Sequence, residues 1–247
     1  VSIYLLENPE NFLIRQMLQS IDKLSVWEEQ PNAFVIYPMP DINTVHSEFG
    51  PFLYKNQLIF TSARNEDLVN SNENSFNKEG YLTIFKATIE DENLRSVKKP
   101  KPFSTKWIGD YHVGPISIDT NNNKISFSKV KSSLSKKKVH YMRAYEADLI
   151  KGKRVRKERE SIFNADSSST GHTSISPSGN VVCFASDRAG SMDLYISQRQ
   201  AGIWSDPKPI VELNTELNEL FPYLKNDSTL LFSSNGHPGY GGFDLFQ

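Results

Sequence analysis

Three histidines are the residues of this sequence best placed to bind a metal or transfer protons near neutral pH. His46, His112 and His172 each lie close to the start of a run that reads as a strand. Imidazoles gathered in the funnel of a closed strand assembly could hold a divalent cation. However, they stand five, three and two residues before the starts of their strands, so they do not share one structural position. We therefore predict no metal site and no bound cofactor.

Two further groups of residues could do chemistry, but each has a simpler structural explanation. The glycine-rich loop Gly236–Gly242 would need a following helix to cradle a phosphate, and a strand at Phe243–Phe246 follows instead. Arg188 and Asp193 leave and enter neighbouring strands, so we expect a cross-hairpin ion pair or turn cap rather than a catalytic pair.

The sequence also lacks the familiar catalytic motifs. It contains no nucleophile elbow, no HExxH pair and no Walker loop. Its single cysteine, Cys183, lies in an apolar run typical of a buried strand, where a thiol is inert. The sequence therefore predicts a protein without catalytic residues, which is not an enzyme.

Composition narrows the class. The chain has 247 residues with 28 Lys+Arg and 29 Asp+Glu, a balance that argues against a generally basic nucleic-acid binder. One cysteine excludes an internal disulfide, and no apolar run reaches the roughly 20 residues of a membrane helix. Asn and Ser make up about one residue in five, and such turn-forming residues suit many short strands.

One segment reads as a helix. Apolar residues recur at helical spacing from Phe12 to Leu24, with Asn8 as the expected N-cap and Pro9 at the first helical position. The helix should end before Pro31. Residues 1–32 are therefore expected to form a helical segment, and residues 33–247 to be all-β.

A repeated strand organises the rest of the chain. Four apolar runs align on a shared aromatic residue, namely Phe60, Phe127, Phe184 and Phe232, at intervals of 67, 57 and 48 residues. Each run follows a shorter strand and a polar turn and precedes a third strand. A four-stranded unit at this period is typical of a β-propeller. We place four antiparallel blade units at about 51–98, 115–158, 173–210 and 221–247.

The number of blades in the complete ring stays open. A strand at 33–37 could serve as the outer strand of the last unit and close a four-bladed ring. Alternatively, the four units belong to a larger ring of five to seven blades, and this is the interpretation we favour.

The repeats resemble a known family. The runs Asn218–Leu224 and Thr229–Leu245, and those at Ser174–Gly179 and Phe184–Arg188, resemble the TolB-like (PD40, WD40-like) propeller repeat of OmpA-family periplasmic proteins. The helix is similar to the last helix of the tetratricopeptide region that often precedes such propellers. The resemblance implies a periplasmic, outer-membrane-associated scaffold, as in the PorE-like lipoproteins of the type IX secretion machinery. Its partners would be other envelope or secretion proteins, and a domain outside this chain would bind peptidoglycan.

Charge is unevenly distributed. Residues 98–160 carry 17 Lys+Arg against 6 Asp+Glu, whereas the remainder is acidic. Such a stretch is either a solvated blade edge that discourages strand pairing or a docking face for an acidic partner. Base-stacking aromatics are not interleaved with the lysines, so we expect no nucleic acid partner, and no segment is expected to insert into a membrane. The candidate partner-binding patch comprises Lys136, Lys137, Lys138, Lys151, Lys153, Arg154, Arg156 and Lys157.

Two other functions stay open at this point. The chain could be the accessory propeller of a peptidase or glycan hydrolase, or it could bind a small ligand in the propeller channel.

Overall fold

The computed structural model describes residues 10–29, 35–64, 80–91, 93–108, 111–130, 140–152 and 154–247. Within these ranges, the elements are one helix, α2 (Phe12–Glu29), one 3-10 turn (Thr105–Trp107) and sixteen strands. The strands are β1 (Glu48–Tyr54), β2 (Gln57–Ser62), β3 (Thr83–Thr88), β4 (Lys101–Pro102), β5 (Val113–Asp119), β6 (Lys124–Val130), β7 (Met142–Ile150), β8 (Arg154–Glu160), β9 (Thr170–Ile175), β10 (Val181–Ser186), β11 (Asp193–Gln200), β12 (Ile203–Trp204), β13 (Lys208–Pro209), β14 (Glu219–Leu224), β15 (Leu230–Ser234) and β16 (Asp244–Phe246).

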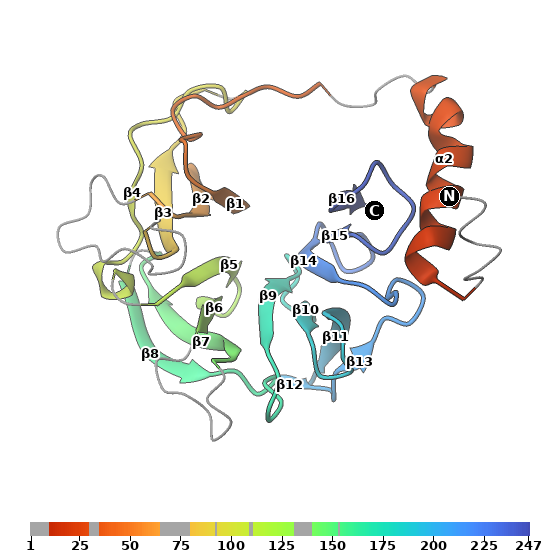
Figure 1. Cartoon of the computed structure of the whole chain (residues 1–247). Helices are drawn as coiled ribbons and strands as arrows, with labels where there is room; N and C mark the ends of the chain where they lie inside the picture. Colours follow the sequence, from red (N-terminus) through yellow and green to blue (C-terminus); the bar gives the residue numbers. More distant parts are fainter. Residues whose placement is uncertain are drawn as a thin grey trace.

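The strands form four antiparallel sheets, which we call blades one to four. Their strand orders are β1-β2-β3-β4, β5-β6-β7-β8, β9-β10-β11-β12 with β13 also paired to β11, and β14-β15-β16. The blades are arranged around a common centre, toward which the inner strands β1, β5, β9 and β14 are turned (Figure 1). This arrangement confirms the predicted all-β fold with four propeller blades.

The shared aromatic residues of the repeat form one structural unit in every blade. Each stacks across the second and third strands on another aromatic ring, with centroids 5.7 to 6.1 Å apart. The pairs are Phe60–Phe85, Phe127–Tyr145, Phe184–Tyr195 and Phe232–Phe246. Such cross-strand aromatic pairs stabilise a sheet through packing and burial. The repeat read from the sequence is therefore a repeat of packing.

A basic side chain covers the aromatic pair in each blade. The guanidinium of Arg64 lies 5.1 Å from the Phe60 ring, and that of Arg188 lies 4.7 Å from Tyr195. In blade two Lys129 takes this place, 5.6 Å from Tyr145, and in blade four the His237 ring packs against Phe246 at 5.1 Å. These side chains serve packing within the blades, where cation–π contacts contribute.

The second strands are buried because neighbouring blades cover them. Every residue of β10 is buried, and so are all residues of β2 except the first. Inner strands β5, β9 and β14 each contact three strands of the preceding blade. In β15 the residues Leu230, Leu231 and Ser233 are partly exposed. Blade four therefore keeps an incompletely covered face.

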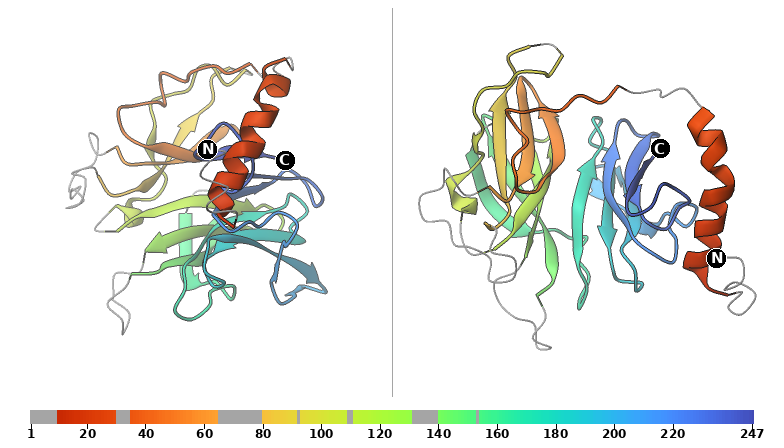
Figure 2. Two further views of the ribbon diagram at one scale, coloured as in Figure 1. Left: turned by 45° about the vertical axis from the view of Figure 1, so that its right-hand side comes forward. Right: turned by 45° about the horizontal axis from the view of Figure 1, so that its top comes forward.

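Helix α2 stands beside the β15–β16 connection of blade four, as two views show (Figure 2). The amide Nε2 of Gln16 donates to the carbonyl of Asn235, and the amide of Gly239 donates to Ser20 Oγ. The Trp27 and Tyr240 rings lie 5.4 Å apart. A long-range polar contact therefore joins the helix to the blade.

The helix start differs from the prediction. The backbone amide of Ile14 donates to Asn11 Oδ1, so Asn11 caps the described helix. The predicted cap Asn8 and the following Pro9 lie outside the described residues. The spacing of apolar residues located the helix, but it did not show which of the two asparagines near its start, Asn8 or Asn11, is the cap.

The outer strands also differ from the prediction. Of the strand expected at 33–37, the described residues Val35, Ile36 and Tyr37 lie outside every sheet and are exposed. The fourth strand of blade one is not at Leu94–Lys98, where an isolated bridge joins Val97 to Ile89, but at Lys101–Pro102. The outer strand β4 is only two residues long and carries no apolar pattern, which explains why the sequence misplaced it.

Candidate functional site

A bulge occurs at the same place in each inner strand and shapes the centre of the molecule. The pairing of inner and second strands shifts between Phe49 and Phe52, and at the equivalent places in blades two to four. The first bulged residue has a positive φ in every blade: Gly50, Gly114, His172 and Phe221. Glycine takes this conformation freely, whereas other residues are strained in it by about 1–2 kcal/mol.

The two glycines are required by close approach between blades. A Cβ at Gly50 would lie 2.5 Å from Pro115 Cβ, and one at Gly114 would lie 2.2 Å from Thr61 Oγ1. Blades three and four carry His172 and Phe221 at this position instead. Non-glycine residues in a strained conformation often mark functional positions.

Those two side chains form an aromatic cluster at the centre. The rings of His172 and Phe221 stack with centroids 4.2 Å apart, and Phe49 meets Phe221 edge to face at 5.5 Å. Phe49 belongs to blade one, His172 to blade three and Phe221 to blade four, so the cluster joins three blades. The sequence carried a signal for the bulges but not for the cluster, since Gly50, Gly114 and Phe221 all precede a proline.

Burial keeps the His172 ring neutral. It lowers the pKa of His172 from 6.5 to about 4. The ring atom Nδ1 is buried and has no hydrogen-bond partner, and the same holds for Thr173 Oγ1 beside it. The backbone amide of His172 donates to Ser128 Oγ, a hydroxyl of the preceding blade. His172 is therefore a packing residue of the centre with an unsatisfied polar atom.

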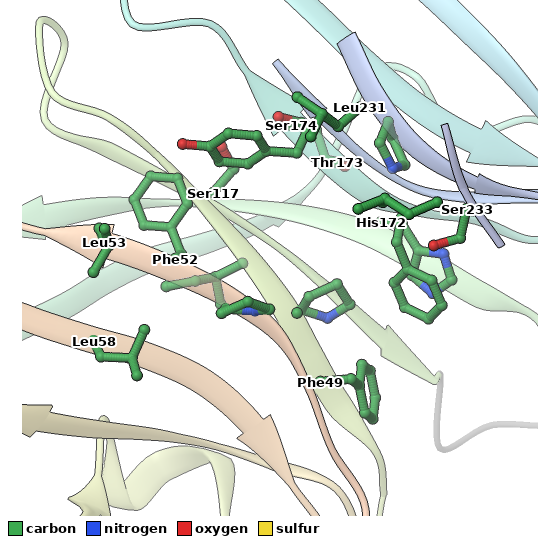
Figure 3. A pocket seen from close by; sticks show the side chains of 18 of the residues that line it. Phe49, Phe52, Leu53, Leu58, Ser117, His172, Thr173, Ser174, Leu231 and Ser233 are labelled. Carbon is green, nitrogen blue, oxygen red and sulfur yellow. The ribbon is translucent and has the colours of Figure 1, made fainter. Parts of the chain in front are cut away.

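A cavity of about 730 Å³ opens at this cluster, lined by residues of all four blades. Figure 3 shows Phe49, Phe52, His172 and Leu231 around it. Among the described residues, its lining contains proline, aromatic, aliphatic and small polar residues but no lysine, arginine, aspartate or glutamate. We call this cavity the central groove. Its chemistry suits an uncharged, mainly apolar occupant.

The second candidate site is the outer strand β8 of blade two. Its basic side chains Arg154, Arg156, Lys157 and Arg159 are exposed, and Lys151 is exposed in the turn before it. Arg159 pairs with Glu146 of β7 at 3.3 Å, and Lys157 lies 3.9 Å from Asp148. Within the described residues, Lys151, Arg154 and Arg156 form no ion pair. We call these five residues the basic edge.

The structure brings part of the predicted basic patch together. Lys151, Arg154, Arg156 and Lys157 lie on or next to β8. Lys136, Lys137, Lys138 and Lys153 lie outside the described residues, so their place in the patch stays a prediction.

The other candidate residues lie apart. His112 Nδ1 accepts from the Leu82 amide and its ring packs on Tyr81, whereas His46 lies in the segment before β1. Burial lowers the pKa of His112. Within the described part of the chain, no three His, Cys, Asp or Glu side chains are grouped to hold a metal ion. The absence of a metal site elsewhere in the chain stays a prediction.

The expected ion pair between Arg188 and Asp193 is wrong. Arg188 donates instead to Ser186 Oγ and to the carbonyl of Phe163, and Asp193 accepts from Ser191 Oγ. Burial raises the pKa of Asp193, and the nearby Glu219 carboxylate adds to this shift. The guanidinium of Arg188 lies over the Phe184 and Tyr195 rings and does not reach Asp193, the partner that closeness in sequence suggested.

The Gly236–Gly242 loop joins β15 to β16, as expected for a turn. Gly241 and Gly242 both have positive φ. Within this loop His237 packs on the aromatic pair of blade four, and its Nε2 lies 2.7 Å from the Leu213 carbonyl. Cys183 is fully buried, and burial raises the pKa of its thiol.

Comparison with known proteins adds information about the fold. No protein-family model and no curated protein matches the sequence. Among solved structures, TolB from Acinetobacter baumannii matches 83% of this chain at 12% identity with a TM-score of 0.45. A putative TolB from Agrobacterium tumefaciens matches 76% at 12% identity and a TM-score of 0.43, and puromycin hydrolase matches 85% at 11% and 0.44.

The structural neighbours thus include TolB-like β-propeller proteins. The chain covers 41%, 60% and 28% of the lengths of these three proteins, respectively, which is less than two thirds of each. At such identities the likeness concerns the fold alone. In the described residues, no helix is both long and apolar enough to cross a membrane.

Proposed function

We propose that this chain is a propeller scaffold that binds other proteins without catalysing a reaction, and that the basic edge is its docking site. The observation that carries the proposal is the row of cations on β8, which blades one, three and four do not share. The outer strands of blades one and three, β4, β12 and β13, have two residues each, whereas β8 has seven, and blade four has three strands in the described part of the chain. A rigid blade thus presents a concentrated positive charge to solvent.

The charge arrangement favours an acidic partner. Glu146 and Asp148 on β7 neutralise part of the edge, while Arg154 and Arg156 are left without an ion pair in the described part of the chain. Exposed cations of this kind steer an oppositely charged surface and raise its association rate at low salt. They add little to stability by themselves. Their grouping is better explained by binding than by folding.

The cellular setting is part of the same proposal. The resemblance of the repeats to TolB-like propellers supports a periplasmic protein associated with the outer membrane. Envelope or secretion proteins, including type IX secretion components, would be its partners, and peptidoglycan would be reached through a domain outside this chain. Fractionation of the native host with an antibody against the chain tests this setting, and a cytoplasmic pool would contradict it.

Fluorescence anisotropy with a labelled polyglutamate peptide tests the docking site. We expect binding at 50 mM salt that weakens at least tenfold in an R154E/R156E/K157E variant and in 500 mM salt. The matched control also reverses three cations, Lys23, Lys208 and Lys225, which are exposed on α2 and in blades three and four. Equal binding by the two variants, or no binding by the unchanged chain, would refute the proposal.

The central groove favours a second candidate function, the binding of a small uncharged ligand. Thermal-shift measurements with a panel of uncharged aromatic compounds test it, with Leu231→Glu as the variant that places a charge in the lining. No stabilisation across the panel would exclude this candidate.

The accessory propeller of a peptidase or glycan hydrolase remains an alternative, to be tested by assaying the full-length protein for both hydrolase activities.

A further inference from the structure

The basic edge is an open strand edge as well as a charged surface. β8 pairs with β7 from Tyr145↔Glu160 to Ile150↔Arg154 and is the last strand of its sheet. The backbone groups on its outer side therefore meet no further strand in the described part of the chain. A strand edge of this length is a template for the addition of another strand.

The other outer strands are protected in ways that β8 is not. β4 and β13 have two residues each and both contain a proline, Pro102 and Pro209, which cannot donate to a ladder. β12 also has two residues. β8 contains no proline along its seven residues. Only its charged side chains and one bulge protect β8 against pairing with another strand. At the bulge Lys157 has a φ of 55°, and the β7–β8 register shifts between Glu146 and Asp148.

The charges of β8 are arranged for one kind of added strand. Its partners Ile150, Asp148 and Glu146 on β7 are two residues apart, so they share a face. Arg154, Arg156 and Arg159 therefore lie on that same face, while Val155 is buried on the other. A second copy of β8 would bring arginine against arginine, which is repulsive. An added strand with carboxylates at alternating positions would bring them opposite Arg154 and Arg156.

We infer that the basic edge binds an extended acidic segment of a partner protein as an additional strand of blade two. This inference rests on the proposed function, because it specifies how the acidic partner is held. Backbone hydrogen bonds to β8 before the bulge supply affinity that does not depend on sequence. The arginine–carboxylate pairs supply the selection for an acidic strand.

The experiment compares two labelled peptides with the same carboxylates. One alternates glutamate with valine, and the other is identical except that all of its backbone amides are N-methylated, which removes the donors on both edges of the strand. We expect the first to bind, the second to bind at least tenfold more weakly, and hydrogen exchange to slow at β8 only with the first. An R154Q/R156Q variant, which removes the two charges but keeps long polar side chains on the strand, should also weaken binding of the first peptide at least tenfold.

The outcomes separate the two proposals. Equal affinity of the two peptides, with β8 exchange unchanged, overturns strand addition and keeps acidic docking. Binding of neither peptide, and of no polyglutamate, overturns docking and strand addition together. Equal binding of a peptide that alternates lysine with valine overturns the charge selection, and with it the inference.

Discussion

Replacing Gly50 with alanine tests whether the centre of the propeller depends on the close approach of blades one and two. Gly50 has a φ of +61°, and a Cβ there would lie 2.5 Å from Pro115 Cβ in the neighbouring blade. Real Cβ contacts of this length essentially do not occur, and a proline ring atom cannot rotate away. The matched control is Gly242→Ala, since Gly242 has a φ of +70° and no atom within 4 Å of its ideal Cβ.

Both variants carry the cost of alanine in a left-handed conformation, about 1–2 kcal/mol, and both lose the same unfolded-state entropy of glycine. Only Gly50→Ala also forces two blades apart, and overpacking of this kind costs about 1–3 kcal/mol. The difference in unfolding free energy between the variants should therefore be about 2 kcal/mol. For a chain of this size that is a difference in Tm of about 4–8 °C.

Circular dichroism melts of the two variants under identical conditions measure this difference. Far-ultraviolet spectra should coincide at 20 °C, because neither change removes a strand. Melting temperatures of Gly50→Ala and Gly242→Ala that agree within 1 °C would refute the reasoning, since they would mean that the blades separate without cost at the bulge.

Three further predictions concern single side chains. Arg188→Met should destabilise the chain by about 2–3 kcal/mol in urea unfolding, because it leaves the Phe163 carbonyl unpaired and uncovers the Phe184–Tyr195 pair. Arg188→Lys should recover part of this loss, because a lysine, Lys129, covers the aromatic pair in blade two. Glu219→Ala should lower the free energy of unfolding by about 3 kcal/mol in the same measurement, because the fully buried carboxylate accepts from the Thr215 amide and from the Thr215 and Ser234 hydroxyls. An unchanged urea midpoint would show that these donors find other partners. The pKa of His172 falls from 6.5 to about 4 on folding, so the unfolded chain binds an additional proton between these pH values. The free energy of unfolding should therefore fall by up to about 3 kcal/mol as the pH drops from 6.5 to 4. The difference in unfolding free energy between the unchanged chain and His172→Phe should be flat above pH 6.5.

The sequence predicted the parts of this fold that depend on local patterns. The aromatic residue of the second strand recurs in every blade because it must stack on an aromatic ring of the third strand. Such a requirement is visible in the sequence as an aromatic residue at the same place in each repeat, namely Phe60, Phe127, Phe184 and Phe232. Outer strands such as Lys101–Pro102 pair through two residues and need no apolar side chain, so their positions could not be read from hydrophobic periodicity. Val35–Tyr37 has the composition of a strand, but a strand also needs a sheet edge within reach, and that is a tertiary condition.

The candidate sites divide in the same way. The basic residues of β8 were visible in the sequence because charge is a property of composition. The aromatic cluster of Phe49, His172 and Phe221 was not, because it depends on which blades meet at the centre. Arg188 illustrates the limit most clearly, since Asp193 is near in sequence but the carbonyl of Phe163 and the rings of Phe184 and Tyr195 hold the guanidinium.

Blade two differs from the others in a way that connects its packing with its charge. Its aromatic pair is covered by Lys129, whose ammonium lies 3.8 Å from Glu158 on β8, and Glu158 also accepts from the indole of the buried Trp107. The outer strand is thus attached to the interior of the blade through Glu158 and Val155, which explains how β8 can be long and ordered while most of its side chains are exposed. Because those anchors face inward, the arginines on the opposite face are not needed to hold the strand in place. Their substitution should therefore change binding at the basic edge far more than it changes stability.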